Sequence, residues 1–410
     1  MILMNKIGLL ENDVQNYAWG SRTAIADLLG RPSPSSGPEA ELWMGAHPKA
    51  PSRVQIDGVW TPLPDVIARD PAGILGDRVV ERFGGKLPFL FKVLAAAEPL
   101  SIQAHPDLTQ ARQGFARENE RGVPLDAPDR NYRDDNHKPE IICALTPFWA
   151  LNGFRSVRDI LGTFDGVGPA ELAPEIKRLA SRRSEQGLRE FFTAIMTMVV
   201  ARKRRAVAEA VARAAACESG DPVCEWMQRL QGRYPGDIGV LSPMFLNLVA
   251  LEPGQAMFLH ARRLHAYLDG AGVELMANSD NVLRGGLTPK HVDVPELLRV
   301  LRFDETAIDV LTPEPRGAGE RAYRTDVDEF RLSVIEVDER TSYAGAEERG
   351  VEIAICTKGS ARIVAVESGN TVTVSRGMSF LVPASVRRYR IEGSATLYRA
   401  SVPRDSEKGE

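Results

Sequence analysis

The sequence contains little of what marks secreted, membrane or disulfide-rich proteins. Only four cysteines occur among 410 residues, and no two of them form a CxxC pair. Such sparse cysteines are expected to stay as buried or spectator thiols in a reducing compartment. No apolar run approaches the ~20 residues that a membrane-spanning helix needs, and no N-terminal segment reads as a signal peptide. We therefore expect a cytoplasmic protein.

The sequence also lacks a large excess of charge of either sign. The formal net charge is -4, with 26% charged and 43% hydrophobic residues, which is ordinary for a globular chain. This balance gives no reason to expect nucleic acid or a membrane as a partner. We expect a monomer whose partner is a small molecule. The length suggests roughly two or three domains, at ~150 residues each.

The hydrophobic pattern changes along the chain. Short extended segments broken by Gly, Pro and Asp fill residues 1–153 and return over 237–318, and helical spacing dominates 154–236. After "TPEPRGAGERA", a linker candidate, residues 319–410 are almost all short strands with frequent turn signals, which is typical of a sandwich or barrel. The sequence predicts a mainly β protein with an α-helical insertion.

The stretch "LSIQAHPD" carries the first sign of chemistry. Residues i and i+2 of a strand face the same side, so Gln103 and His105 project together. Pro106 favours extended geometry at His105 and strengthens that pairing. A simple hydrogen-bonded Gln–His pair is the structural alternative for these two residues taken alone.

Two further segments supply matching donors. In "DNHKPEIICAL", Lys138 and Glu140 flank Pro139 and share one face of an extended segment, and "RRLHAYLDG" offers His265. Two imidazoles, a carboxylate and an amide oxygen would make a four-ligand divalent site, suited to Zn²⁺, with Mn, Fe or Co also possible. Glu140 would be the only negative ligand. The bound ion would therefore keep enough charge to stabilise an oxyanion, which indicates a catalytic site.

A faint internal repeat links the two β-rich regions. "RGMSFLVPASVRR" resembles the second signature of the cupin family, and "PGQAMFLHARRLH" matches its glycine and histidine. Arg388 stands where that signature places a metal histidine, so we expect a C-terminal barrel without metal ligands. The expected fold is two cupin-type jelly-roll barrels plus a helical domain. The first barrel would comprise 1–153 and 237–318, the helical domain 154–236, and the second barrel 319–410.

Seven motifs in order sharpen this interpretation: "QNYAWGS", "AELWMGAHP", "LPFLFKVL", "LSIQAHPD", "NHKPE", "HAYL" and "ANSDNVLRGGLTPKH". Together they resemble the type I mannose-6-phosphate isomerases, zinc-dependent cupin enzymes that interconvert mannose 6-phosphate and fructose 6-phosphate. The resemblance implies one Zn²⁺ per chain on Gln103, His105, Glu140 and His265. It also implies that the helical domain caps the mouth of the catalytic barrel.

The resemblance further implies roles around the substrate. It assigns catalytic roles to Arg284, Lys138, Glu274 and Asp280, and contacts near the sugar phosphate to Lys92, Lys290 and Arg284. We rank the base that moves a proton through a cis-enediol(ate) as Glu274, then Lys138, then Asp280. His137 is a candidate for assisting ring opening. One departure is that Arg263 and Leu264 precede His265 where the family has a proline.

Two other functions remain open at this level. A metal cupin oxidoreductase would need an iron site that is usually richer in histidine. A non-catalytic sugar-phosphate-binding cupin would need neither a base nor charge that stabilises an enediolate. The presence of Glu274, Asp280 and Arg284 therefore favours the isomerase.

Overall fold

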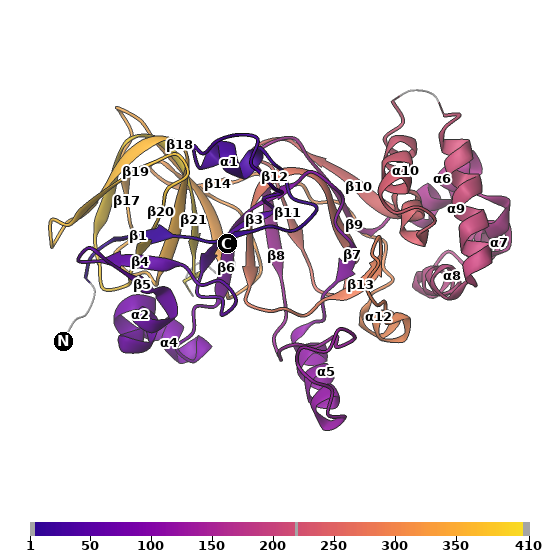
Figure 1. The fold of residues 1–410 in the computed structure, drawn as a ribbon, viewed down its shortest axis with the longest axis horizontal. Coiled ribbons are helices and arrows are strands. Elements are labelled where there is room, and N and C mark those ends of the chain that lie inside the picture. The colour runs from indigo at the N-terminus through magenta and orange to yellow at the C-terminus, as the bar shows by residue number, and fades with distance from the viewer. Residues whose placement is uncertain (1–4, 218–219, 405–410) are drawn as a thin grey trace.

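The computed structural model describes residues 5–217 and 220–404, which form three bodies in a row (Figure 1). A ten-stranded sheet, here called the site sheet, lies in the middle. An eleven-stranded sheet, the second sheet, lies beside it, and a helical domain lies at the other end. The fold class is confirmed as mainly β with a helical insertion, although the strand pairing closes neither sheet into a barrel.

The site sheet is assembled from distant parts of the chain. Its central path is β10-β9-β12-β6-β3-β2, with β7, β8, β11 and β13 paired alongside. Its strands are β2 (Val14–Gln15), β3 (Glu41–Gly45), β6 (Phe89–Ala96), β7 (Ile102–Ala104), β8 (Glu140–Ala144), β9 (Phe148–Phe154), β10 (Leu246–Leu251), β11 (Ala256–Leu259), β12 (His265–Ala277) and β13 (Leu283–Gly286).

The second sheet unites the two ends of the chain. Its strands are β1 (Gly8–Glu11), β4 (Arg53–Ile56), β5 (Val59–Pro62), β14 (Glu314–Gly317), β15 (Glu320–Ala322), β16 (Arg331–Val337), β17 (Tyr343–Ala344), β18 (Glu352–Ala365), β19 (Thr371–Ser375), β20 (Ser379–Val382) and β21 (Tyr389–Ser401). β1 pairs with β20 on one side and β4 on the other. The expected boundaries 1–153 and 319–410 therefore differ from the sheets, because N-terminal strands and β14 belong to the second sheet.

The helical domain contains α6 (Val157–Val167), η1 (Ala170–Leu172), α7 (Ala173–Ser181), α8 (Glu185–Thr197), α9 (Val200–Ala214) and α10 (Pro222–Arg233). Polar side chains fix where several helices begin. Ser156, Ser184 and Asp221 each accept a hydrogen bond from a backbone N–H of the first turn of α6, α8 and α10. Such N-caps satisfy amides that have no partner within the helix.

The remaining helices connect or flank the sheets. They are α1 (Ala24–Leu28), α2 (Leu63–Arg69), α3 (Pro71–Leu75), α4 (Asp77–Phe83), α5 (Leu108–Glu120), η2 (Ile238–Leu241), α11 (Ser242–Phe245) and α12 (Val294–Val300). α5 begins directly after the "LSIQAHP" segment. Asp107 and Gln110 form a capping box there, which defines the end of the extended segment.

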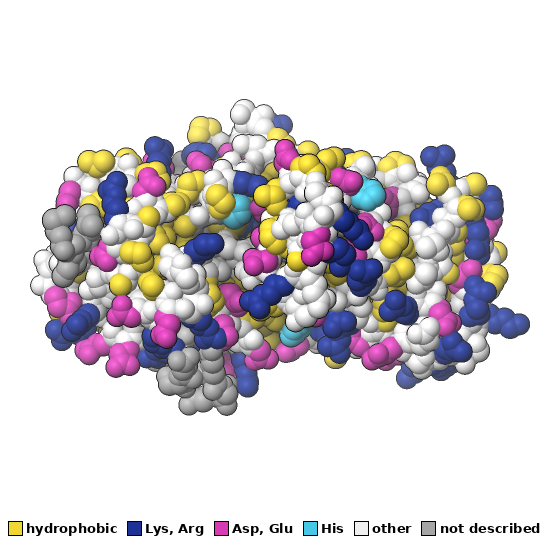
Figure 2. Space-filling view, turned by 90° about the horizontal axis from the view of Figure 1, so that it is seen from below, with side chains coloured by type: hydrophobic (Ala, Val, Ile, Leu, Met, Phe, Trp, Pro, Cys, Tyr) yellow, Lys and Arg dark blue, Asp and Glu magenta, His cyan; other side chains and the backbone are white. Residues whose placement is uncertain are grey.

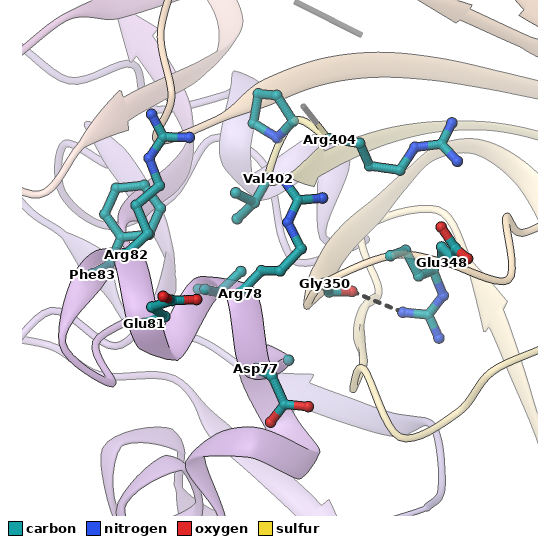
Figure 3. Close-up of a pocket in the computed structure, with 13 residues that line it drawn as sticks. Asp77, Arg78, Glu81, Arg82, Phe83, Glu348, Gly350, Val402 and Arg404 are labelled. Atoms are coloured by element: carbon teal, nitrogen blue, oxygen red, sulfur yellow. Dashed lines mark hydrogen bonds between the residues drawn. The ribbon is translucent and has the colours of Figure 1, made fainter. Parts of the chain in front are cut away.

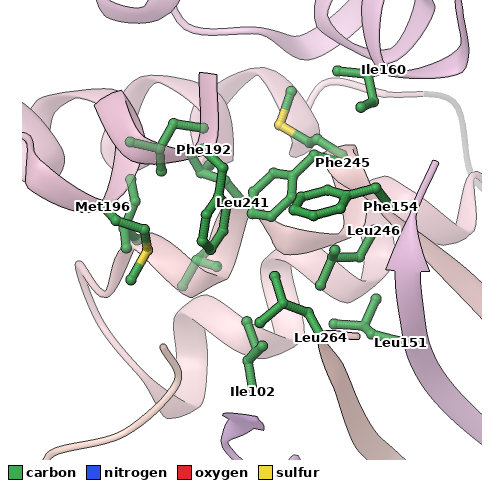
Figure 4. Close-up of a cluster of buried hydrophobic side chains, with 14 of the residues drawn as sticks. Ile102, Leu151, Phe154, Ile160, Phe192, Met196, Leu241, Phe245, Leu246 and Leu264 are labelled. Carbon is green, nitrogen blue, oxygen red and sulfur yellow. The ribbon is translucent and has the colours of Figure 1, made fainter. Parts of the chain in front are cut away.

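Strand alternation gives the site sheet two different faces. Gln103, His265 and Tyr267 lie on what we call the inner face, and their neighbours along the strands lie on the outer face. On the outer face, Ile102 and Leu264 join a core that continues into the helical domain (Figure 4). The helical domain thus supports the site strands from behind. The expectation that it caps a barrel mouth is wrong, because its core packs on the face opposite these side chains.

A second core joins the two sheets. Phe91 and Val93 of β6 and Leu275 of β12 pack with Leu332 and Ile353 of the second sheet. All eight residues of β6 are buried, because one face of the strand packs against the second sheet and the other against side chains of the inner face. The site strands are therefore packed against apolar side chains on their outer face along their length, which restricts their movement.

Two cysteines depart from the expectation of free thiols. Cys143 and Cys356 are free and buried. Cys217 and Cys224 instead form a disulfide between the end of α9 and the first turn of α10. A spacing of seven residues gave no signal in the sequence, because the pairing depends on how the two helices meet.

Basic and acidic side chains are interspersed over most of the face shown in Figure 2. Arg–Glu pairs such as Arg205 with Glu171 and Arg213 with Glu209 account for several of the exposed charges of the helical domain. No helix among the described residues combines the length and the apolar character needed to cross a membrane.

Candidate active site

The site sheet brings the four expected ligands to one face. Gln103 lies on β7, His105 follows that strand, and Glu140 and His265 begin β8 and β12. His265 is directly opposite Gln103 in the ladder, and opposite residues share a face. His105 faces the same side as Gln103 because it is two residues further on.

Three of these side chains meet at close range. The Nε2 atoms of His105 and His265 each lie 3.4 Å from the same oxygen of Glu140, Oε2. All three residues are at most 2% exposed, and these three atoms have no hydrogen-bond partner within the described chain. Converging buried acceptors without partners are costly unless a cation lies between them. Their chemistry fits a divalent metal with nitrogen and oxygen ligands.

The other imidazole nitrogens set the tautomers. His105 Nδ1 lies 2.6 Å from the carbonyl oxygen of Asn281, and His265 Nδ1 lies 3.2 Å from that of Arg263. A carbonyl can only accept, so each Nδ1 carries the proton and each Nε2 keeps its lone pair for a metal. Burial also lowers the pKa of His105 to about 4, which keeps this ring neutral at pH 7.

The segment that holds His265 is itself fixed. Arg262 has a positive φ of 71° and donates its backbone N–H to the carbonyl of His105 at 2.7 Å. Arg263 lies 3.4 Å from Asp304. The loop without the family's proline is therefore held by contacts to His105, just after β7, and to the segment after α12.

Glu140 has two differently used oxygens. Oε2 faces the histidines, and Oε1 lies 3.0 Å from Nζ of Lys138. Burial alone would raise the pKa of Glu140, but Lys138 and His105 outweigh it and hold that pKa well below its usual range. Glu140 is thus an anion available to a metal, and Lys138 is held beside the centre.

A buried chain of charges extends from Glu274 along the inner face. Glu274 accepts hydrogen bonds from Nζ of Lys92 at 2.9 Å and from the hydroxyl of Tyr267 at 2.8 Å. Lys92 also lies 3.4 Å from Glu41, whose other oxygen accepts from Trp43. Burial raises the pKa of Glu274, and nearby Lys92 opposes that rise. Glu274 therefore holds a proton more readily than a solvated carboxyl.

Glu274 shares a face with the metal-ligand cluster. Glu140 is opposite Met276 in the ladder, two residues along β12 from Glu274. The side chains of Glu274 and Glu140 consequently project to the same side of the sheet. Lys92, directly opposite Glu274, is 6% exposed and already paired with two carboxylates, so the structure does not present it as a free cation for a phosphate.

Positive charge gathers at β13 and just after it. Arg284 is opposite Gln103 in the ladder and half-buried. Burial lowers the pKa of Arg284, and the nearby charge of Arg133 lowers it further. Burial, Arg284 and Arg133 together lower the pKa of Lys290. Among the described residues neither Arg284 nor Lys290 forms a salt bridge, so this cluster is suited to bind an anion.

Two expected site residues are engaged elsewhere. The imidazole of His137 lies 2.6 Å from Glu329, in the segment before β16. Asp280 pairs with Lys49 at 2.7 Å and lies 3.7 Å from His47. Burial alone would raise the pKa of Asp280, but the hydrogen bonds with His47 and Lys49 hold it far below its usual range. The structure therefore does not join His137 or Asp280 to the metal-ligand cluster.

The sequence of this chain is similar to proteins of known family. Residues 7–157 match the family described as phosphomannose isomerase type I, catalytic domain, and residues 169–246 match its helical insertion domain. Residues 320–402 match the mannose-6-phosphate isomerase cupin domain. Mannose-6-phosphate isomerase of Escherichia coli (strain K12) is 42% identical over 392 residues, which span 95% of this chain and 98% of that protein. The chain belongs to the type I phosphomannose isomerase family.

Further proteins of the phosphomannose isomerase family are similar to this chain in sequence and in structure. The Homo sapiens mannose-6-phosphate isomerase is 39% identical over 313 residues, 71% of each chain. A crystal structure of a single-residue variant of phosphomannose isomerase from Salmonella typhimurium superposes with a TM-score of 0.91 at 39% identity, covering 97% of this chain and all of that one. A zinc-bound mannose 6-phosphate isomerase structure gives 0.90 at 39% identity, with the same coverage.

One residue of this family member escaped the sequence analysis although it organises the site. Asn281 is fully buried, and its side-chain oxygen accepts from the backbone N–H of Arg133 at 2.7 Å and of Asp134 at 3.2 Å. Its amide donates to the carbonyls of Asp134 at 2.8 Å and Asn136 at 2.9 Å. Asn281 therefore holds the loop that leads into Lys138 and Glu140 with its side chain, while its own carbonyl orients His105.

Two more neighbours were missed. Arg133 belongs to the cationic cluster, and Asn152 is opposite His265 in the ladder with a buried Oδ1 that has no partner in the described chain. Neither residue stands in a recognisable pattern. Only the presence of Asn152 within the "ALNGF" run, where a polar residue interrupts a buried strand, could have marked it.

Proposed function

We propose that this chain is a metal-dependent aldose–ketose isomerase that interconverts mannose 6-phosphate and fructose 6-phosphate. The observation that supports this most strongly is the meeting of His105 Nε2, His265 Nε2 and Glu140 Oε2, three buried atoms without partners, beside Lys138. The names of the relatives support mannose 6-phosphate as the aldose, and fructose 6-phosphate is the ketose that its isomerisation would give. A sugar-binding protein without catalysis would need no such centre.

Gln103, His105, Glu140 and His265 would hold one divalent cation, which we take to be Zn²⁺. The zinc-bound relative and the absence of thiol ligands in this set favour that ion. When bound, it would supply positive charge that stabilises negative charge on the sugar oxygens. Lys138, 3.0 Å from Glu140, would add a second positive charge next to the same oxygens.

Glu274 is our choice for the base. In its ionised form it would take the proton from C2 of the open-chain aldose, leaving the electron pair in a cis-enediol(ate), and it would return a proton to C1. The step balances because the C2 proton is moved to C1 and the O2 hydroxyl proton to O1, so C2 is oxidised as C1 is reduced and no net oxidation occurs. A pKa raised by burial suits this exchange, since the group must accept and release a proton near neutral pH.

The surrounding groups would hold Glu274 in place. Tyr267 and Lys92 donate to its two oxygens, so we assign Lys92 to positioning and charge balance rather than to the sugar phosphate. Arg284, Lys290 and Arg133 are better placed for that phosphate because they form a cluster of positive charge at β13. The low pKa of Asp280 makes it a weak base, so we do not assign it the proton transfer.

A direct assay separates this proposal from the alternatives. Protein stripped of metal should not convert mannose 6-phosphate, and Zn²⁺ should restore conversion. Conversion that persists after exhaustive chelation would refute metal dependence, and no conversion by metal-loaded protein would refute the isomerase itself. We further propose a cytoplasmic monomer, and light scattering behind size exclusion would test the oligomeric state.

A further inference from the structure

The inner face of the site sheet changes from apolar to polar at one row of side chains. Phe148 and Ala150 of β9 and Tyr267 of β12 belong to a buried apolar cluster on this face. Two residues beyond Ala150, Asn152 lies directly opposite His265 in the ladder. Asn152 therefore begins the polar part of β9 on the inner face, next to a metal ligand.

The row that contains Asn152 crosses four strands. His265 is opposite Asn152 on one edge of β12 and opposite Gln103 on the other. Gln103 is in turn opposite Arg284 of β13. Opposite residues of antiparallel strands share a face, and neighbouring strands are about 4.8 Å apart, so the row extends over roughly 14 Å of the inner face. Arg284 and Asn152 are its ends, and two of the metal ligands lie between them.

The amide of Asn152 is buried without a partner. The residue is 6% exposed, and its Oδ1 forms no hydrogen bond within the described chain. Its backbone is fixed, because the carbonyl oxygen accepts a hydrogen bond from the side chain of Asn247 at 3.1 Å. A leucine of similar size would avoid the cost of an unpaired acceptor. An amide at this position therefore indicates a partner that is not part of the chain.

The ends of the row also orient the proposed substrate, so this step rests on the proposed function. The four proposed ligands already supply the number of protein donors that Zn²⁺ usually takes, which leaves Asn152 for the molecule bound beside them. The cationic cluster of Arg284, Arg133 and Lys290 would bind the phosphate on C6, and the oxygens of C1 and C2 would lie at the metal ligands. The open chain then runs from β13 toward β9, with its C1 end nearest Asn152.

The proposed base lies on the same side. Tyr267 is opposite Ala150 in the ladder, two residues from Asn152, so the side chains of Tyr267 and Asn152 are neighbours on the inner face. The hydroxyl of Tyr267 donates to Glu274 at 2.8 Å. A single side chain therefore links the surroundings of Asn152 to the carboxyl group that would move the proton between C2 and C1.

We propose that Asn152 is a further residue of the active site and that its side-chain amide binds O1 of the sugar. O1 is a carbonyl oxygen in the open-chain aldose and a hydroxyl group in the ketose. A carbonyl oxygen only accepts hydrogen bonds, whereas a hydroxyl group also donates one. The amide offers N–H donors and an acceptor oxygen, so Asn152 is complementary to O1 before and after the reaction without gaining or losing a proton.

Two ligands that differ only at C1 test this contact. Mannitol 6-phosphate is the reduced, open-chain form of mannose 6-phosphate, and 1-deoxymannitol 6-phosphate has a methyl group in place of its C1 hydroxymethyl group. Neither contains a carbonyl, so neither is converted during calorimetric titration of the zinc-loaded full-length chain. Asn152→Leu should weaken binding of mannitol 6-phosphate by about 10-fold and change binding of the 1-deoxy compound by less than about 2-fold.

The outcomes separate a contact with O1 from other roles. Equal losses for the two ligands, or no loss for either, would overturn the contact, as would the failure of both ligands to bind the parent protein. A competitive zinc titration should give the same metal affinity for the parent and for Asn152→Leu. A loss of zinc affinity would make Asn152 part of the metal centre instead, which also overturns the proposal.

A matched control comes from the second sheet. The side chain of Asn370 accepts a hydrogen bond from the backbone N–H of Ile7 at 2.8 Å. Asn370→Leu should therefore lower the melting temperature and leave both affinities unchanged. Asn152→Leu should show the opposite pattern, because its Oδ1 has no hydrogen bond within the described chain to lose. If Asn152→Leu does not fold, Asn152→Ala provides the measurement and should show the same selective loss for mannitol 6-phosphate.

Binding of these ligands at another place would not imitate the result. The cavity of about 400 Å³ in Figure 3 lies beside α4, and all of its described lining residues lie outside the site sheet. A ligand held there would not respond to Asn152. The isomerase assay gives a separate answer. Conversion of mannose 6-phosphate without selectivity at C1 refutes only the role of Asn152, and selectivity without conversion refutes only the proposed function.

Discussion

Replacing Asn281 by alanine should damage the metal centre without touching a ligand. The substitution keeps the backbone carbonyl that accepts from His105 but removes the side chain that ties residues 133–136 in place. This loop runs directly into Lys138 and Glu140. We therefore expect a loss of both stability and metal affinity.

The magnitude follows from the bonds that are lost. Four backbone groups, two N–H and two C=O, lose their partner on a residue that is 0% exposed. At about 0.5–1.5 kcal/mol each, the free energy of unfolding should fall by roughly 2–6 kcal/mol. Metal affinity should fall by about 10–100-fold, the range typical when groups behind metal ligands are altered.

Urea unfolding and a competitive zinc titration measure the two effects. Asn12→Ala is the control. Asn12 forms side-chain hydrogen bonds of 2.7 Å with Ser379 and with Ser52, but it follows β1 of the second sheet and contacts no metal ligand. It should lose stability and keep metal affinity. If Asn281→Ala binds zinc as tightly as the parent, or loses no more stability than Asn12→Ala, the positioning role is refuted.

Three other predictions concern pH, catalysis and the helical domain. Burial lowers the pKa of His105 to about 4, from about 6.5 in the unfolded chain. Between these pH values the unfolded chain binds more protons than the folded one. At about 1.36 kcal/mol per pH unit, the free energy of unfolding of metal-free protein should fall by about 3 kcal/mol on acidification through this window. His105→Gln should lack this component in urea unfolding. Glu274→Gln should lower kcat by about 100-fold or more with KM within a few-fold; near-normal kcat would exclude it as base. Phe192→Ala, in the shared outer-face core, should cost about 3–5 kcal/mol and speed hydrogen exchange in β7, whereas unchanged exchange would mean that the helices do not support this strand.

The parts of the site that sequence could predict are those set by local geometry. Gln103 and His105 share a face because strand residues alternate, and Lys138 and Glu140 do so for the same reason. The change from period two to helical spacing near residue 154 is likewise a local feature, and α6 begins at Val157. These features need no knowledge of which segments meet in space.

The parts that sequence missed depend on long-range partners. Lys92 looked like a phosphate ligand, but its counter-charges come from Glu41 and Glu274, which are 51 and 182 residues away. Asn281 is one of many loop asparagines until the loop at 133–136 is placed against it. The disulfide between Cys217 and Cys224 likewise depends on where two helices end.

The pairing of β1 with β20 has a consequence for how the protein is made. Gly8 and Leu381 are neighbours in one ladder, so β1, which can pair early with β4, must wait until residues as far as Leu381 are synthesised before its other edge is paired. Until then the edge of β1 that faces away from β4 presents unpaired amide groups to the cell. Chains truncated before β20 should consequently be favoured clients of chaperones and should yield insoluble product.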